Sequence, residues 1–477
     1  MECIEIRERK EGNHEVPMID EKKIRNKKQI RKLLYDKFIC PMQAERTDYV
    51  GVEFEFPILN LKKEAVNFAL CHQLAEAFAE HFHMDKIHRD RENHIYLAST
   101  PLTGDSLSFD CSYNTLELSF GPESDIHVLE GRFHDYYNFI QNFLSMEQHT
   151  LTGMGVNPYH DFNHSQPVPV GRYEMLYNYL KSAGKYGAKD YHDFPDYGMY
   201  SCASQVQLDV SEDTVCTVLN AFNRLEPFKA VLMANSLFSS RPDHLLNRDY
   251  FWKKSSHGIN PKNVHMFTED FHNIEELLSY YENVSLFCTE REGHYLSFAP
   301  LPLSQYFMQE KIKGDYEENG QCRNLYFQPQ PQDIAYLRTY HLESLTFRGT
   351  VEFRSVCMQP VAELWASPAL HAGLIRKADE LQNLILHSPY GKENPINLRE
   401  KWCRKNWQDQ EDTEILSGFL MEILDLAKTG LKERGHGEEG YLQALYKRAQ
   451  NLLSPAAELE LLLKKGESLE NCILAYR

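Results

Sequence analysis

The sequence predicts an α+β protein in which an antiparallel or mixed sheet is backed by helices and followed by a helical C-terminal region. Segments 112–120, 202–210 and 349–356 alternate apolar and polar residues, which is the period of a strand with one buried face. Longer stretches, such as 125–148 and 213–234, follow the spacing of helices instead. Strands and helices do not alternate in strict βαβ order, which argues against a doubly wound parallel sheet.

The first 46 residues are highly charged, and we expect a helical extension over 1–46. It contains a basic run interleaved with Ile24, Ile30, Leu33 and Leu34. The basic residues are Lys22, Lys23, Arg25, Lys27, Lys28, Arg31 and Lys32. Such a run either binds an anionic surface or forms a solvated amphipathic helix, and the acidic remainder of the chain favours the helix.

Two larger units follow, 47–366 and 367–477. The first opens with a strand over 49–59 that we expect Pro57 to end, because proline cannot donate to a strand ladder. In the second, Ser367 and Pro368 resemble an N-cap followed by proline at the first helical position. The further helices that the spacing predicts cover 64–82, 369–386, 410–429 and 438–465.

Composition excludes several classes of partner. The chain has 477 residues and a net charge of −18, which argues against broad binding of nucleic acid phosphates. No apolar run approaches the roughly 20 residues of a membrane span, and the N-terminal residues lack the apolar core of a secretory signal. Eleven scattered cysteines form no C-x-x-C pair. We therefore expect a cytoplasmic protein with reduced cysteines that binds neither nucleic acid nor membrane.

The most informative feature is a set of polar residues on strands where apolar side chains are expected. Glu53 and Glu55 are two residues apart, so they project from one face of their strand. The pattern recurs at Thr115, Glu117 and Ser119, at Gln205, Gln207 and Asp209, and at Thr350, Glu352 and Arg354. For any one strand a solvated sheet face explains it better, but three strands with a central glutamate weaken that explanation.

If these strands are neighbours in one sheet, Glu53, Glu55, Glu117 and Glu352 converge on one cavity. Converging carboxylates repel one another unless cations lie between them, and oxygen ligands suit Mg²⁺, which usually also carries substrate phosphates. Arg354 is placed to neutralise such a phosphate. The chain has neither a P-loop nor a G-x-G-x-x-G fingerprint. The residues alone therefore suggest an Mg²⁺–nucleotide site on the concave face of a sheet.

An ordered set of motifs resembles the glutamate–cysteine ligases, especially those of the plant and proteobacterial type. The run GVEFEF at 51–56 is similar to their G-x-E-x-E opening. The other similar segments are LELSFGPE, PVGRYEMLYNYL, CASQVQLD, LEPFKAVLMANSLF, the segment from Arg248 to Trp252, and GTVEFRSVCMQP. No single motif is decisive, but their order is specific, and together they cover roughly residues 48–370.

This resemblance implies a fold like that of glutamine synthetase, with an antiparallel, saddle-shaped sheet lined by acidic side chains and backed by helices. It implies an enzyme in which the γ-carboxylate of L-glutamate takes the γ-phosphoryl group of ATP, assisted by Mg²⁺. The amine of L-cysteine then attacks the acyl phosphate, which gives γ-glutamylcysteine, ADP and phosphate. The implied partners are these small molecules, and both a monomer and a homodimer stay open.

The resemblance also implies roles for individual residues. Its metal-binding acids correspond to Glu53, Glu55, Glu117 and Glu352. Arg354 meets phosphate or the acyl phosphate and acts with Glu352 in catalysis, while Gln205 lies near metal and nucleotide. Arg172 and Arg248 hold substrate carboxylates, with Trp252 in the same segment, although a surface ion pair is the alternative for both arginines. Asp110 matches a further acidic position only loosely.

Two departures weaken part of this assignment. The segment between Glu92 and Glu117 does not follow the plant pattern closely, and the region after about residue 370 has no counterpart. Because acceptor choice usually lies in irregular loops, cysteine is the weaker half of the prediction. Three alternatives stay open: a ligase for another amine, a catalytically silent binding relative, and a phosphotransferase such as a guanidino kinase.

Overall fold

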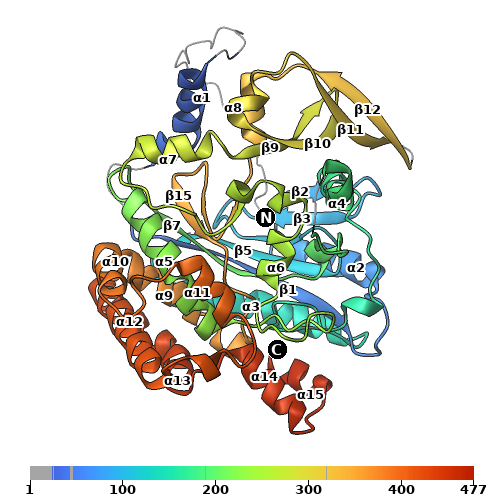
Figure 1. The fold of residues 1–477 in the computed structure, drawn as a ribbon. Helices are drawn as coiled ribbons and strands as arrows, with labels where there is room; N and C mark the ends of the chain where they lie inside the picture. The colour runs from blue at the N-terminus through green and yellow to red at the C-terminus, as the bar shows by residue number, and fades with distance from the viewer. Residues whose placement is uncertain (1–23, 25, 43–46, 188–189, 319) are drawn as a thin grey trace.

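The computed structural model describes residues 24, 26–42, 47–187, 190–318 and 320–477 (Figure 1). Its centre is a nine-stranded antiparallel sheet, the main sheet, in the order β14-β15-β7-β1-β5-β4-β3-β2, with β6 paired to β1. The strands are β1 Val50–Asn60, β2 Lys86–Arg89, β3 Ile95–Ser99, β4 Ser106–Phe109, β5 Thr115–Glu123, β6 His149–Leu151, β7 Ser204–Asp209, β14 Glu343–Leu345 and β15 Thr350–Phe353.

One face of the main sheet is apolar and packs against helices. Phe54 of β1 lies 5.8 Å from Phe133 and 5.2 Å from Trp365, measured between ring centroids. Phe353 of β15 lies 4.4 Å from Phe222 in the same way. The helices of this layer are α2 Phe68–His81, α3 Ile126–Ser145, α5 Val215–Met233 and α9 Ala366–Ile375. The apolar half of each alternating strand is therefore buried against helices, and the polar half faces the other way.

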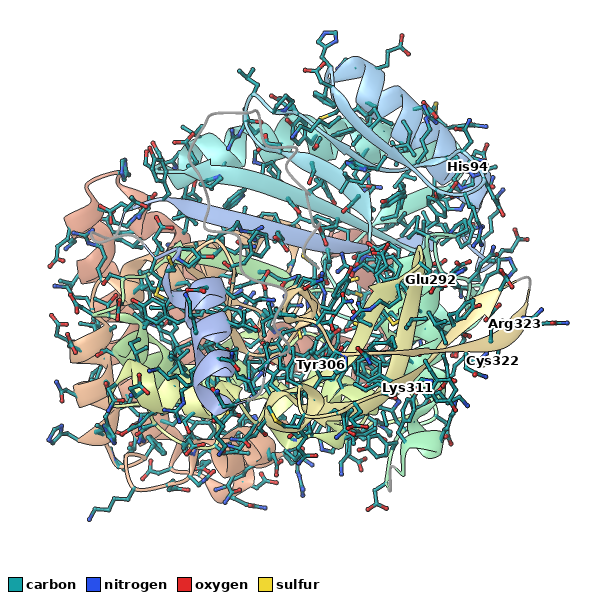
Figure 2. The ribbon with its side chains drawn as sticks, turned by 90° about the horizontal axis from the view of Figure 1, so that it is seen from above. His94, Glu292, Tyr306, Lys311, Cys322 and Arg323 are labelled. Carbon is teal, nitrogen blue, oxygen red and sulfur yellow. The ribbon has the colours of Figure 1, made fainter. Side chains whose placement is uncertain are left out.

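The polar face of the main sheet looks toward a second layer (Figure 1). This layer contains a four-stranded sheet of β9 Ser285–Arg291, β10 His294–Pro302, β11 Ile312–Glu318 and β12 Gln321–Phe327. Its outermost strand is β12, where Cys322 and Arg323 are exposed at the edge of the molecule (Figure 2). Beside it are the parallel pair β8 Val264–His265 and β13 Tyr340–His341, and helices α4 Gly171–Lys181, α6 Arg248–Lys253, α7 Ile274–Tyr281 and α8 Leu303–Tyr306.

The C-terminal residues form further helices that pack on the helical layer. They are α10 Ala378–Leu386, α11 Pro395–Trp402, α12 Thr413–Arg434, α13 Gln443–Asn451, α14 Pro455–Lys464 and α15 Leu469–Ala475. Helix α12 packs against α9, and both α10 and α11 pack against α5. Among the described residues, no helix is both long and apolar enough to cross a bilayer. The α+β class, the antiparallel sheet and the helical C-terminal region are confirmed.

The N-terminal amphipathic helix is observed as α1 Lys27–Leu34, and a π-helical turn Tyr35–Ile39 follows it. The helix buries Ile30 and Leu34, while Arg31 bonds Glu275 of α7 at 2.9 Å. A basic exposed face and an apolar buried face fit the solvated amphipathic helix rather than an anionic-surface patch. Lys22, Lys23 and Arg25 lie outside the described residues, and the division of the chain at 46 and 366 stays a prediction.

Three local predictions were wrong. Strand β1 continues through Pro57, because Pro57 lies between the residues that pair with β7, ending at Phe54, and those that pair with β6, beginning at Ile58. No ladder bond therefore requires its missing N–H. Helix α9 begins at Ala366 with Trp365 as its N-cap, so Ser367 and Pro368 lie inside the first turn. The predicted helices 369–386 and 438–465 are each divided in two, into α9 and α10 and into α13 and α14.

Candidate active site

Neighbouring strands bring the predicted acidic residues to one face of the main sheet. Glu55 of β1 lies directly opposite Glu117 of β5, and Glu53 lies opposite Gln205 of β7. Strand β15, which carries Glu352, pairs with β7 on its other edge. All four glutamates are buried although they lie on the polar face, because the second layer covers them. Four carboxylates buried on one sheet face are costly when charged, so they either take up protons or bind cations.

One group of carboxylates has the geometry of a metal site. Oxygen atoms of Glu55, Asp110 and Glu117 all lie within 4.8 Å of one another, and all three residues are buried. Burial raises the pKa of Glu55 to about 7, and the carboxylates of Asp110 and Glu117 act in the same direction. The pKa of Asp110 is also raised, first by burial and then by Glu117. Three oxygen donors that repel one another in a buried site suit a hard divalent cation such as Mg²⁺.

The local chain explains how Asp110 enters this group. It follows directly after β4, where Cys111 adopts a left-handed backbone conformation with a φ of 59°. This turn carries the chain back into β5, whose Glu117 accepts hydrogen bonds from Ser108 at 3.3 Å and from Ser119 at 2.8 Å. The β4–β5 turn therefore places an acid beside two strand residues. The sequence pattern alone matched Asp110 only loosely, because a turn has no fixed period.

Glu53 and Glu352 form a second acidic group beside the first. The Gln207 side chain donates to Glu53 at 2.7 Å and to Glu352 at 3.2 Å, so one amide bridges the two carboxylates. Burial, followed by repulsion from Glu352 and Glu117, raises the pKa of Glu53 to about 8. Burial also acts to raise the pKa of Glu352, but the ion pair with Arg354 outweighs it, and the pKa of Glu352 is lowered. The two groups together supply five acids.

Arg354 lies at the centre of this arrangement, just after β15. Its Nη1 donates to Glu352 at 2.5 Å. Burial acts to lower the pKa of Arg354. The carboxylates of Glu352, Glu55 and Glu53 outweigh this effect and raise the pKa, so the guanidinium stays charged. Arg354 lines two cavities, and a fixed positive charge at their junction can neutralise a group that passes between them.

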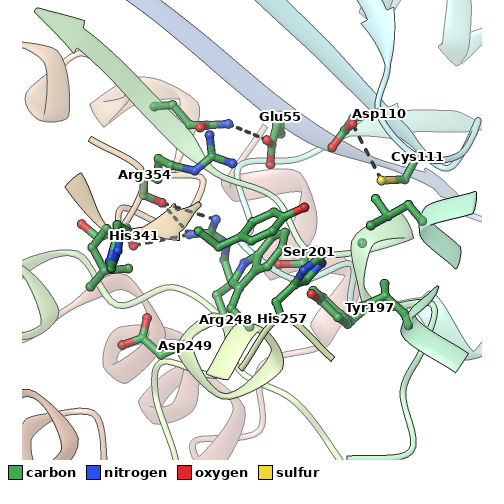
Figure 3. Close-up of a pocket in the computed structure, with 18 residues that line it drawn as sticks. Glu55, Asp110, Cys111, Tyr197, Ser201, Arg248, Asp249, His257, His341 and Arg354 are labelled. Carbon is green, nitrogen blue, oxygen red and sulfur yellow. Dashed lines mark hydrogen bonds between the residues drawn. The ribbon is translucent and has the colours of Figure 1, made fainter. Parts of the chain in front are cut away.

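The first cavity encloses about 660 Å³ including its open mouth. Figure 3 shows Glu55, Asp110 and Arg354 on one side of it, with His257 and Tyr197 on the other. Gln205 also lines the cavity, and its Nε2 donates to Glu55 Oε1 at 2.7 Å. The Oε1 atom of Gln205 is buried and has no hydrogen-bond partner among the described residues. Gln205 thus lies beside the acids that we expect to bind metal, and its role near metal and nucleotide stays a prediction.

Two of the three predicted substrate residues, Arg248 and Trp252, line the same cavity, and Arg172 is not among its lining residues. Arg248 is buried, and its Nη1 donates to the backbone carbonyls of Ser355 at 3.3 Å and Val356 at 3.2 Å. Trp252 stacks on Tyr340, with ring centroids 4.7 Å apart. Arg248 therefore braces the chain after β15 as well as lining the cavity.

Arg172 lies at the start of α4 and is half-buried. Together with Arg354, it partly opposes the burial that raises the pKa of Asp110. Arg172 therefore supplies positive charge near Asp110, and both its role in holding a substrate carboxylate and the ion-pair alternative stay predictions.

The second cavity is larger, about 1170 Å³, and the sequence pattern did not identify it. Residues Lys37, Phe38, Arg338, Phe347, Glu352 and Arg354 line it. Lys37 donates to the carbonyls of Ile334 at 2.7 Å and Leu337 at 3.0 Å, so the N-terminal segment closes one wall. Residues from three distant parts of the chain form this cavity, so no local sequence motif predicts it.

Comparison with known proteins supports one family. The profile of the family described as glutamate-cysteine ligase family 2 matches residues 49–472. The chloroplastic glutamate–cysteine ligase of Nicotiana tabacum is 24% identical over 87% of this chain and 75% of its own length. That of Brassica juncea is 25% identical over 64% of this chain and 57% of its own length. Alignments to the other relatives from plants cover as little as 53% of the relative.

Among solved structures, a glutamate–cysteine ligase of Francisella tularensis in complex with AMP is similar over 91% of this chain and 88% of its own. The identity is 12% and the TM-score is 0.49. The profile match extends well past residue 370, into the helices of the C-terminal region.

Proposed function

The chain belongs to glutamate–cysteine ligase family 2, and we propose that it is an ATP-dependent ligase that joins the γ-carboxylate of L-glutamate to the amine of L-cysteine. The products are γ-glutamylcysteine, ADP and phosphate. One observation carries the proposal: a buried cluster of acids lies beside Arg354, at the junction of two cavities. A cytoplasmic location and the choice between monomer and homodimer stay predictions.

The three acids Glu55, Asp110 and Glu117 fit Mg²⁺, and Glu53 with Glu352 provides further oxygen ligands beside them. Bound Mg²⁺ would neutralise these carboxylates and the phosphates of ATP and so favour transfer of the γ-phosphoryl group. The raised pKa values of Glu53 and Glu55 support this fit, because they express charge that the protein alone does not compensate.

We place ATP in the second cavity and the two amino acids in the first. Phe38 and Phe347 offer the second cavity apolar surface for a base, while Arg338 and Arg354 supply positive charge for phosphates. The terminal phosphate then faces Arg354, which also lines the first cavity. This placement brings the γ-carboxylate of glutamate and the γ-phosphorus to the same guanidinium.

The reaction then proceeds in two displacements. A γ-carboxylate oxygen of glutamate attacks the γ-phosphorus, the bond to the bridging oxygen breaks, and ADP leaves. The acceptor amine, having lost a proton, attacks the carbonyl carbon of the acyl phosphate, and the bond to the phosphate oxygen breaks. Arg354 stabilises the negative charge that develops on the transferred phosphoryl group and on the leaving phosphate.

A phosphate-release assay tests the proposal. The protein is incubated with ATP, Mg²⁺ and L-glutamate, with and without a panel of amines that includes L-cysteine. We expect phosphate release that depends on L-cysteine and is matched by γ-glutamylcysteine. Turnover with a different amine alone would identify a related ligase, and ADP with a stable phosphorylated product would identify a phosphotransferase. Nucleotide binding without any turnover would identify a silent relative.

A further inference from the structure

On the side of the first cavity opposite the carboxylates, a group of uncharged and mostly aromatic residues lies beside Arg248 and Asp249 (Figure 3). We call this the aromatic side, and it consists of Leu176, Leu180, Tyr197, Trp252, His257 and Tyr340. Trp252 stacks on Tyr340 and meets Tyr197 edge-on, with ring centroids 5.0 Å apart. Burial raises the pKa values of Tyr197 and Tyr340, so both phenols stay neutral. These phenols therefore offer a ligand hydrogen bonds but no charge.

His257 is the exception in polarity, and its hydrogen bonds are incomplete. The side chain is 3% exposed and lies in a 3-10 turn, Ser256–Ile259, with its ring 3.8 Å from that of Tyr340. Neither of its ring nitrogens has a hydrogen-bond partner among the described residues. Burial lowers the pKa of His257 to about 3, so the ring is neutral, with one donor and one acceptor nitrogen.

A buried imidazole without hydrogen-bond partners lowers the stability of the protein unless a ligand supplies those partners. A buried polar group without a partner costs about 1–3 kcal/mol, so proteins rarely keep one without a reason. Four further polar atoms of residues that line the same cavity also lack hydrogen-bond partners among the described residues: Ser201 Oγ, Gln205 Oε1, Arg248 Nε and His341 Nε2. Because His341 Nδ1 lies 3.0 Å from the His265 carbonyl, it carries the proton, and Nε2 is an acceptor. The cavity is thus provided with acceptors and donors for a neutral polar group.

The charges of the substrates decide which group enters this side. Glutamate carries two carboxylates and an ammonium, which need charged partners such as Arg354. Asp249 is already paired with Arg399 at 2.6 Å, and the Nη atoms of Arg248 bond backbone carbonyls, which leaves Arg248 Nε for a substrate carboxylate. The aromatic side therefore suits an uncharged group that can both donate and accept a hydrogen bond. A thiol or a hydroxyl on the acceptor side chain meets this description.

We propose that the aromatic side is the subsite for the acceptor side chain, and that His257 selects α-amino acids whose small side chain ends in a thiol or hydroxyl. This inference rests on the proposed ligase function and adds the residue that determines acceptor specificity. A site built to hydrogen-bond a polar group discriminates strongly against an analogue that lacks it. The acceptor side chain is therefore small and uncharged, and amino acids with charged side chains are excluded.

Three acceptors test the proposal: L-cysteine, L-serine and L-2-aminobutyrate, which has a methyl group in place of the thiol or hydroxyl. In the native enzyme, we expect kcat/KM for L-cysteine to exceed that for L-2-aminobutyrate by at least about tenfold. In His257→Phe, this preference should fall to about threefold or less, while the KM values for glutamate and ATP stay within about twofold. His257→Gln keeps one donor and one acceptor and should retain most of the preference.

His371→Phe is the matched control. His371 is also fully buried, and burial lowers its pKa to about 3, but it lies on the helical side of the main sheet, 4.7 Å from Phe353 between ring centroids. Removing this imidazole should leave the acceptor preference unchanged. Thermal unfolding of all variants shows whether each one is folded at the assay temperature.

The outcomes separate the two claims. A folded His257→Phe enzyme with the native acceptor preference overturns the inference and leaves the ligase function intact. Absence of turnover with every acceptor in the native enzyme contradicts the proposed function instead. If His257→Phe does not fold, calorimetry on the native enzyme with Mg²⁺ and a non-hydrolysable ATP analogue decides. L-cysteine should then bind at least about tenfold more tightly than L-2-aminobutyrate, and equal affinities overturn the inference.

Discussion

At the scale of single residues, Glu53 and Glu55 link protonation to stability. Burial raises their pKa values to about 8 and about 7 from an ordinary 4.5. A raised pKa means that the folded protein binds more protons than the unfolded chain. The contribution of these two residues to stability is therefore complete below about pH 4.5 and is lost as the pH rises through about 7 to 8.

Mg²⁺ should reverse this loss, because it binds the charged carboxylates of the folded protein. Without Mg²⁺, we expect the melting temperature to fall between about pH 6 and about pH 9. Millimolar Mg²⁺ should raise the melting temperature more at the higher pH, where no proton has to be displaced. Thermal unfolding at both pH values with Mg²⁺ or with a chelator measures this. An equal effect of Mg²⁺ at both pH values would argue against these acids as its ligands.

Asp110 provides a second test at this scale. Asp110→Asn keeps the shape of the side chain but removes one charge from the group with Glu55 and Glu117. We expect kcat/KM to fall by about 100-fold or more, because a weakened metal site stabilises less of the charge that develops on the phosphoryl group during its transfer. The control is Asp209→Asn, on the same sheet face but opposite Thr350 and outside both cavities, with less than about a threefold effect. Similar rates for Asp110→Asn and native enzyme would contradict the assignment.

At the scale of elements, the C-terminal helix α11 supports the cavity helix α6. Arg399 of α11 is 1% exposed and forms ion pairs with Asp249 of α6 at 2.6 Å and with Glu226 of α5 at 2.7 Å. The Nη2 atom of Arg399 also donates to Asp249 Oδ1 at 3.1 Å. Because α6 carries Arg248 and Trp252, the C-terminal region positions two residues of the first cavity.

Arg399→Met should therefore destabilise the protein strongly, because it removes the shared guanidinium of two buried carboxylates and leaves Asp249 only His265 and Glu226 only Lys229 as ion-pair partners among the described residues. Breaking such a pair costs about 3–5 kcal/mol of unfolding free energy. Lys253→Met is the matched control, since Lys253 pairs with Glu400 between the same two helices at a largely exposed position. That pair is worth about 0–1 kcal/mol. Urea unfolding of both variants checks the difference, and equal small losses would show that Arg399 does not brace α6.

Element patterns also explain what the sequence could predict. Strands β1, β5, β7 and β15 were recognisable because their alternation reflects a sheet with one apolar face, and the site acids follow from it. The β4–β5 turn that presents Asp110 has no such period, and the Arg399–Asp249 pair joins residues 150 positions apart. The prediction at Pro57 was wrong because β1 accommodates this proline in the gap between its pairing with β7 and its pairing with β6. Only the assembled sheet shows that gap.

The cavity residues outside the strands were harder still. Lys37 lies in a charged segment and His257 in a turn, and each resembles an ordinary polar residue there. No sequence pattern therefore distinguishes either residue. Their importance comes from burial and from neighbours that lie far away in the chain, such as Tyr340 beside His257. Tertiary packing therefore determines the first and second cavities, whereas strand alternation determines the acidic face.

At the scale of the whole molecule, the second layer encloses the polar face of the main sheet between two cavities. The net charge of −18 is mostly solvated surface, but five of the acids lie buried at the place where both cavities meet Arg354. Under the proposed function, the phosphoryl group passes from the nucleotide in one cavity to glutamate in the other at this place, and the enclosure would exclude water from the acyl phosphate.

The central claim is that the γ-carboxylate of glutamate becomes an acyl phosphate before the amine attacks. L-Glutamate labelled with ¹⁸O in its γ-carboxylate tests this most directly, with mass spectrometry of the phosphate released in the presence of ATP, Mg²⁺ and L-cysteine. The account predicts that each phosphate released carries one ¹⁸O atom from glutamate, in step with γ-glutamylcysteine. Phosphate without ¹⁸O, released at the same rate, would contradict it.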